Sequence, residues 1–141
     1  QPQYEHQDFS FVADAELKKI IERDYTELQQ LDPYTSPKSV LILSGSIIEG
    51  LLIDALVTKG DFPSAGECGR FLKDLIYPAK NAGVIKHDNL SEILRVFRNL
   101  VHPAREIKDS LNFDQPHAAH SRAAVDVIIS DVRTWYANRP K

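Results

Sequence analysis

Residues 37–59, PKSVLILSGSIIEGLLIDALVTK, constrain the fold of this 141-residue chain more than any other segment. Their apolar side chains cover most of the circumference of a helix, which is typical of a helix buried on all sides. Ser36 suits the N-cap, Pro37 the first helical position and Gly60 the stop. We therefore expect the other elements to pack around one central helix.

The polar residues of this segment form a second pattern. Four of them fall near one face at helical spacing: Ser46, Glu49, Gly50 and Asp54. We call them the polar seam and expect it to face another element rather than water. Glu49 and Asp54 also interrupt the longest apolar run, which argues against a membrane span.

Further helices are predicted on both sides of the central one. Apolar residues recur at three- and four-residue spacing over residues 11–31, where Ser10 or Asp14 could cap the helix, and over residues 117–138. Strand-like alternation is not convincing anywhere in the sequence. The expected fold is an all-α bundle of four to five helices in a single domain, residues 1–141.

Two capping boxes mark the remaining helices. The first, SAGE at residues 64–67, predicts a third helix that ends at Gly83 and buries apolar side chains. These side chains are Phe71, Leu72, Leu75 and Ile76. The second, NLSE at residues 89–92, predicts a fourth helix that ends or kinks at His102-Pro103.

Composition limits the classes of function. Seventeen Lys plus Arg against 20 Asp plus Glu give a net charge of -3, so any contact with nucleic acid must come from a local basic patch. A lone cysteine, Cys68, excludes an intramolecular disulfide and suits a reducing, cytoplasmic setting, and we expect no signal peptide at the start of the sequence. Because no methionine is present, we expect the chain to be cut from something longer.

The segment RVFRNLVHPARE, residues 95–106, contains the candidate catalytic residues. Arg95, Arg98, Asn99 and His102 share one face of the predicted fourth helix. Arg98 has a forked donor that matches two phosphate oxygens, and His102 can exchange a proton near neutral pH. Together they could cleave a phosphodiester without a metal, and Asn99 could orient the histidine or the phosphate.

A structural interpretation of the same residues stays open. An arginine and a histidine in the last helical turn commonly hydrogen-bond the free carbonyls of that turn. Arg95 and Arg98 could equally pair with Glu49 or Asp54 on the neighbouring helix.

The segment ILRVFRNLVHPARE resembles the signature of the HEPN superfamily (higher eukaryotes and prokaryotes nucleotide-binding), a group of helical bundles. In that signature an arginine and a polar residue precede a histidine by four to six intervening residues. Here Arg98-Asn99 matches the first part, but three residues separate Arg98 from His102. Arg95 has six before His102, but Val96 follows it.

The likeness extends over residues 37–105. LILSGSIIEGLLIDALV is similar to the second helix of these proteins, and GRFLKDLIYPAKNAGVI to the segment before the motif helix. The resemblance implies a homodimer in which two motif helices build one composite site. It places single-stranded RNA across the dimer groove, with Arg98 on the scissile phosphate and His102 assisting attack by the 2′-hydroxyl.

Other residues are assigned to the site with this resemblance in mind. Arg98 needs a partner if it is buried, and Ser46, Glu49 or Asp54 of the polar seam could hold it. A basic rim could extend the site, formed by Arg105, Lys108 and Arg122.

Many prokaryotic HEPN proteins are metal-independent ribonucleases of toxin–antitoxin, abortive-infection and CRISPR systems. The resemblance therefore implies an endoribonuclease without cofactor, with an antitoxin or another protein as partner. The alternative is a catalytically silent module that dimerises or binds a nucleotide, nucleic acid or partner protein.

His117 and His120 have metal-compatible spacing but no convincing third ligand, so we expect exposed first-turn residues there.

Overall fold

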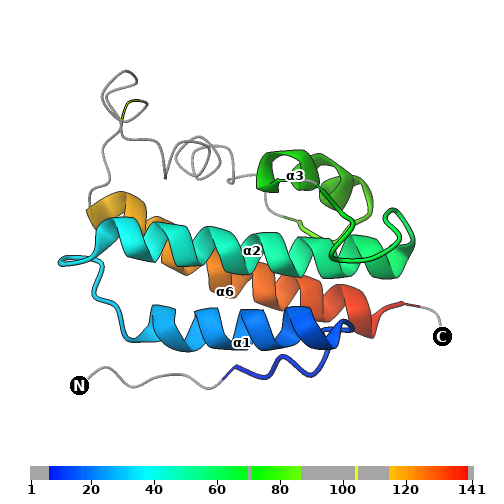
Figure 1. Cartoon of the computed structure of the whole chain (residues 1–141), viewed down its shortest axis with the longest axis horizontal. Helices are drawn as coiled ribbons and strands as arrows, with labels where there is room; N and C mark the ends of the chain where they lie inside the picture. The colour runs from blue at the N-terminus through cyan, green and yellow to red at the C-terminus, as the bar shows by residue number, and fades with distance from the viewer. Residues whose placement is uncertain (1–6, 70, 87–103, 105–114, 140–141) are drawn as a thin grey trace.

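The computed structural model describes residues 7–69, 71–86, 104 and 115–139, and this part of the chain is helical without a strand (Figure 1). Its helices are α1 (Ala15–Gln29), α2 (Pro37–Lys59), α3 (Leu72–Asn81) and α6 (Gln115–Ala137). The predicted all-α bundle is confirmed. The predicted fourth helix, residues 89–102, lies outside the described residues.

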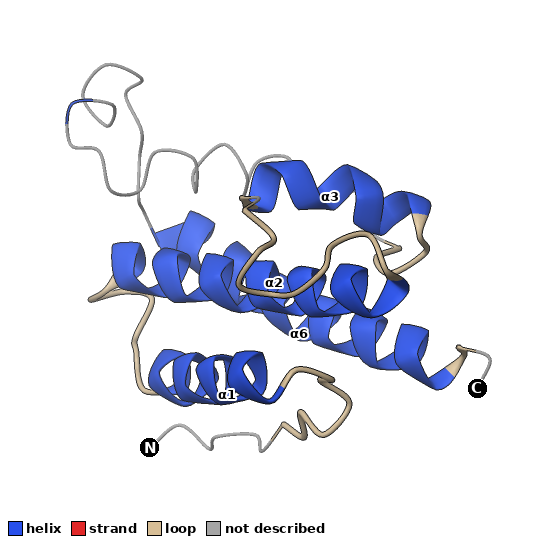
Figure 2. Cartoon of the chain, turned by 45° about the vertical axis from the view of Figure 1, so that its right-hand side comes forward, coloured by secondary structure: helices blue, strands red, loops and turns tan. Residues whose placement is uncertain are grey.

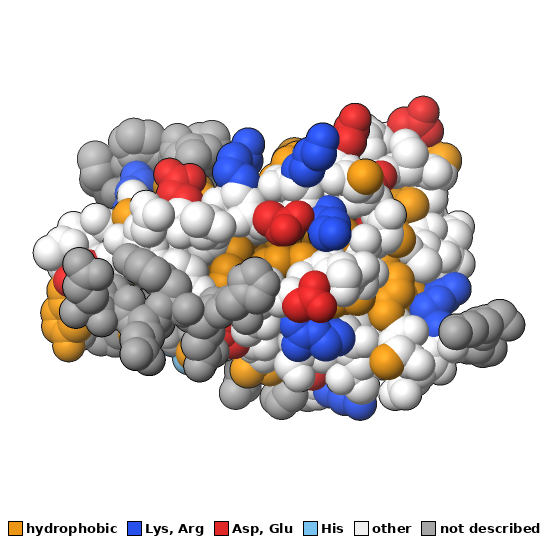
Figure 3. Space-filling view, turned by 90° about the horizontal axis from the view of Figure 1, so that it is seen from below, with side chains coloured by type: hydrophobic (Ala, Val, Ile, Leu, Met, Phe, Trp, Pro, Cys, Tyr) orange, Lys and Arg blue, Asp and Glu red, His pale blue; other side chains and the backbone are white. Residues whose placement is uncertain are grey.

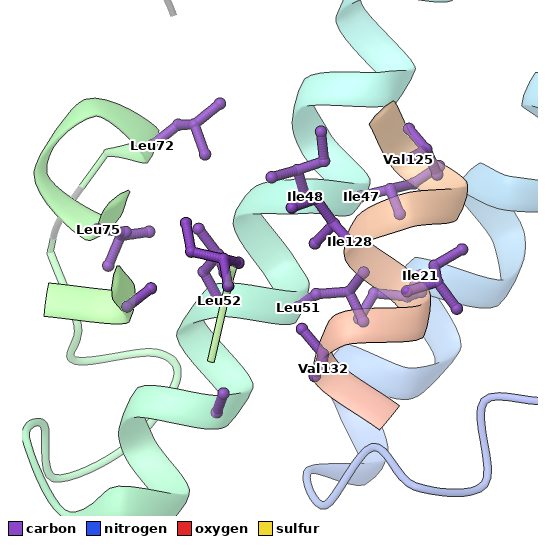
Figure 4. Packing of buried hydrophobic residues seen from close by; sticks show 14 of the residues in the cluster. Ile21, Ile47, Ile48, Leu51, Leu52, Leu72, Leu75, Val125, Ile128 and Val132 are labelled. Carbon is purple, nitrogen blue, oxygen red and sulfur yellow. The ribbon is translucent and has the colours of Figure 1, made fainter. Parts of the chain in front are cut away.

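Helix α2 is the centre of the bundle. It packs against α1, α3 and α6, with α3 on one side and α1 and α6 on the other (Figure 2). In Figure 4, Leu72 and Leu75 of α3 approach α2 near Leu52, while Ile47 and Leu51 lie on the side of α2 nearer α1 and α6. Packing on several sides explains why the apolar residues of α2 cover most of its circumference.

The same apolar character gives α2 the length and composition of a membrane-crossing helix. In the bundle, 67% of its most apolar window is buried against other parts of the chain. The interior of this fold therefore accounts for most of the apolar surface of α2.

Both ends of α2 follow the predicted signals. Pro37 is the first helical residue, where its missing N–H costs no hydrogen bond. Gly60 has a left-handed backbone with a φ of 102°, and its N–H donates to the Val57 carbonyl at 2.9 Å. The Asp61 N–H donates to the Leu56 carbonyl at 2.9 Å, which completes a Schellman motif.

The start of α1 differs from the prediction. The helix begins at Ala15 rather than near residue 11, and Asp14 is its N-cap, with a carboxylate that accepts the Leu17 N–H at 2.9 Å. Ser10, the other predicted cap, donates instead to the Asp8 carboxylate, from its N–H at 2.9 Å and its hydroxyl at 3.1 Å. Residues 9–12 thus form a turn that brings Phe9 into the core.

The predicted start of α3 is wrong. Ser64 and Glu67 form a turn, with the Glu67 N–H donating to the Ser64 carbonyl at 3.2 Å, and the helix begins only at Leu72. Phe71, predicted to be buried, is 71% exposed because it precedes the first turn. The predicted glycine end is confirmed: Gly83 has a φ of 73° and donates to the Lys80 carbonyl at 3.0 Å.

Candidate functional site

Most of the predicted site lies outside the described residues. This holds for Arg95, Arg98, Asn99, His102 and Arg105, and also for Lys108 of the predicted rim. The polar seam of α2, which includes Glu49, is described in full. The geometry of the candidate site is therefore built from the seam and its partners.

Glu49 projects from α2 toward the beginning of α3. Its half-buried carboxylate lies near the Leu72 N–H, the first of α3. The N-cap of α3, Phe71, provides no side-chain hydrogen bond, and Glu49 lies near this helix start. Burial raises the pKa of Glu49 above its ordinary value, and the Leu72 N–H opposes part of this shift.

Ser46 and Gly50 lie on a different side of α2 and face α1. The Ser46 hydroxyl donates to the buried Asp24 carboxylate at 2.7 Å. A Cβ atom added to Gly50 would lie only 3.1 Å from the Ile21 side chain, so the two backbones are close here. The predicted seam faces other elements as expected, but its members face different ones: Ser46 and Gly50 face α1, Glu49 lies near the start of α3, and Asp54 contacts α6 and the segment before α1.

Asp54 is the centre of the most extensive polar network among the described residues. Its side chain is almost completely buried, and it accepts the N–H groups of Ala13 at 3.0 Å and Asp14 at 2.9 Å. It also accepts a hydrogen bond from the Tyr136 hydroxyl of α6, which lies 2.9 Å from the Thr58 hydroxyl. One carboxylate therefore joins α2, α6 and the segment before α1.

The protonation of Tyr136 fits this arrangement. Burial raises the pKa of its phenol well above the ordinary value, and the hydrogen bond to Asp54 raises it further. The phenol therefore stays a donor to the carboxylate at physiological pH. This geometry provides an anchor for the fold rather than a reactive acid or base.

The sequence singled out Asp54 as a polar residue in a buried helix but gave no sign of its partner. Tyr136 is 82 residues away along the chain, within the predicted helix of residues 117–138. Its position on the apolar stripe of residues 117–138 was the only available signal.

Arg122 does not extend a basic rim, which corrects the prediction. Its guanidinium donates to Asp126 at 3.0 Å and to the Tyr25 hydroxyl at 3.3 Å, and it lies over the Tyr25 ring at 5.1 Å. Tyr25 also donates to Asp126 at 3.0 Å. The arginine is therefore held in a half-buried network between α1 and α6, and its charge has a carboxylate partner.

The charged side chains on the α1 side of the molecule are not all of one sign. Acidic and basic side chains are mixed over the face seen in Figure 3, with apolar side chains between them. His120 is exposed on α6, whereas the side chain of His117 lies outside the described part. Within that part, no three His, Cys, Asp or Glu side chains converge as metal ligands would.

Comparisons of this chain with protein-family models, with curated proteins and with solved structures found no match. The relation to HEPN proteins therefore rests on the residues quoted above, namely the RNLVH motif and the segments that precede it.

Proposed function

We propose that this protein is a HEPN-like, metal-independent endoribonuclease that acts as a homodimer. The observation that carries the proposal is the sequence Arg98-Asn99 followed by His102, all on one face of the predicted fourth helix. It combines a forked cation for a phosphate with a group that titrates near neutral pH.

The proposed reaction needs only the substrate and these side chains. His102 accepts the proton of a ribose 2′-hydroxyl while the 2′-oxygen bonds to the adjacent phosphorus and the 5′-oxygen leaves. His102 of the second copy in the dimer donates a proton to that leaving oxygen. Arg98 stabilises the charge that develops on the phosphate, and the products are a 2′,3′-cyclic phosphate and a 5′-hydroxyl.

The helices around the motif support this proposal. Within the segments that resemble HEPN proteins, α2 spans the predicted residues and α3 ends at the predicted glycine. The sequence before the motif therefore has the helical form that the resemblance implies. A role in a toxin–antitoxin or defence system, with an antitoxin as protein partner, is part of the same proposal.

A second candidate function is a catalytically silent HEPN-like module that dimerises or binds a nucleotide, nucleic acid or protein. The spacing favours it, because three residues rather than four to six separate Arg98 from His102. The described contacts of the seam favour it as well. Ser46 and Asp54, two of the residues proposed as partners of Arg98, already make hydrogen bonds within the bundle.

Cleavage of single-stranded RNA in the presence of EDTA distinguishes the two. We expect wild-type protein to release 2′,3′-cyclic phosphate ends, and Arg98→Ala and His102→Ala each to reduce the rate by about 100-fold or more. Arg23→Ala is the matched control, because this arginine side chain is 69% exposed on α1. Equal, background-level cleavage by all four proteins would show that the module is silent.

A further inference from the structure

The outer face of α3 has an unusual surface. Among the described large hydrophobic residues, Tyr34, Phe71 and Tyr77 are each more than 70% exposed, and two of them belong to α3 or its N-cap. Leu75 on the opposite side of the helix is completely buried against the bundle. The helix therefore presents its aromatic side chains to solvent while aliphatic ones fill the core.

Lysines flank the exposed tyrosine. Lys73, Tyr77 and Lys80 follow one another at spacings of four and three residues, so they share a face of α3, and both lysines are exposed. We call these three residues, with Phe71 at the N-terminal end, the α3 stripe. Tyr77 lies about 9 Å along the helix axis from Phe71, which leaves room for separate groups on the two rings.

The stripe lies in a locally basic part of an acidic chain. Between residues 71 and 86 there are three lysines, Lys73, Lys80 and Lys86, and one acid, Asp74, which gives a net charge of +2. The whole chain has a net charge of -3. Helix α1 has four acids and three bases, and the charges of α2 and of α6 each cancel with histidine neutral. Among the described helices α3, with two lysines and one acid, is therefore the one with a net positive charge.

We propose that the α3 stripe binds single-stranded nucleic acid, with Tyr77 stacking on a base and Lys73 and Lys80 contacting phosphates. Proteins that bind single strands combine exposed aromatic rings with cationic side chains, because every base has a face that can stack on a ring. A protein partner fits less well, since lysine is depleted at protein–protein interfaces. The inference rests on the proposed function for the identity of the strand, RNA, and adds binding residues that are not part of the motif sequence.

Binding is measured with a fluorescent single-stranded RNA of about 12 nucleotides, by anisotropy, on protein carrying His102→Ala so that the probe stays intact. We expect Tyr77→Ala to weaken binding about ten-fold and Tyr77→Phe to keep it, because the ring rather than the hydroxyl stacks. Lys73→Gln and Lys80→Gln should each reduce the slope of log affinity against log salt by about 0.7.

Two control variants are matched in exposure. Tyr34→Ala removes a tyrosine that is 72% exposed in the connection before α2, and Lys19→Gln removes an exposed lysine of α1. Both should bind RNA like the parent. If Tyr77→Ala binds as tightly as Tyr34→Ala, or if the parent does not bind the probe, the proposal is overturned.

Sedimentation of the same variants identifies a protein interface instead. A stripe that mediates self-association would turn a dimer into a monomer in Tyr77→Ala and leave RNA affinity unchanged, which also overturns the proposal. The nuclease is tested separately, on protein that retains His102. If Tyr77→Ala loses RNA binding but wild-type protein cleaves no RNA, the stripe is supported and the nuclease is rejected. If wild-type protein cleaves RNA but Tyr77→Ala binds it normally, the nuclease is supported and the stripe is rejected.

Discussion

The Tyr136 hydroxyl donates a hydrogen bond to the buried Asp54 carboxylate, and this contact joins the last helix to the central one. The same carboxylate holds two N–H groups at the start of α1. The C-terminal helix and the N-terminal segment therefore share one buried acceptor on the central helix, and both of them supply donors to it.

Tyr136→Phe should reduce the free energy of unfolding by about 2 kcal/mol, because it removes a hydrogen bond to a buried charge and leaves the Thr58 hydroxyl without this partner. Urea denaturation measures the loss. Tyr34→Phe is the control, since its exposed hydroxyl should matter by less than about 0.5 kcal/mol. Equal stability of the two variants would contradict the assigned role of Asp54.

Asp14→Ala should destabilise the protein by about 1 kcal/mol, because the Leu17 N–H loses its capping carboxylate. Ser64→Ala tests the cap that was predicted for α3. Because no helix begins at Ser64, this change should alter the stability by less than about 0.5 kcal/mol. Thermal unfolding followed by circular dichroism compares the two. A larger loss for Ser64→Ala would restore the helix start that the sequence predicted.

Gly50→Ala should destabilise the protein by about 1 kcal/mol, although alanine is the better helix former. The new methyl would lie 3.1 Å and 3.3 Å from two carbons of Ile21, which is completely buried in the core. Gly66→Ala is the control, since nothing lies within 4 Å of its added Cβ. A gain in urea midpoint for Gly50→Ala would show that α1 moves away at little cost.

Glu49→Gln should raise stability at pH 7. Burial raises the pKa of Glu49 in the folded protein, so the folded state binds more protons than the unfolded state, and stability falls as pH rises from the unfolded to the folded pKa. Glutamine keeps an acceptor for the Leu72 N–H without a charge. The advantage should disappear below about pH 4, where the wild-type carboxyl is neutral in both states.

Urea midpoints at pH 7 and below pH 4 provide this comparison, with the exposed Glu67→Gln as control. A loss of stability in Glu49→Gln at pH 7 alone would contradict this prediction. Such a loss would indicate a cationic partner for Glu49, as in the predicted pair with Arg98.

The sequence by itself determined the helical class, the position of α2 and the glycine ends of α2 and α3. Pro37, Gly60 and Gly83 act through their own backbone angles and through hydrogen bonds that span a few residues, so their effect can be predicted locally. The all-round apolar pattern of α2 similarly needs no knowledge of which helix covers which side.

Tertiary structure decided where α1 and α3 begin and how the polar seam is used. Asp54 takes up the N–H groups of Ala13 and Asp14, 41 and 40 residues away, and α3 begins at Leu72, although its N-cap Phe71 provides no side-chain hydrogen bond. A capping pattern can be predicted from a few neighbouring residues, but an acceptor on another helix exists only after the chain has folded. The start of α1 therefore involved a distant partner, whereas the start of α2 and the glycine ends of α2 and α3 did not.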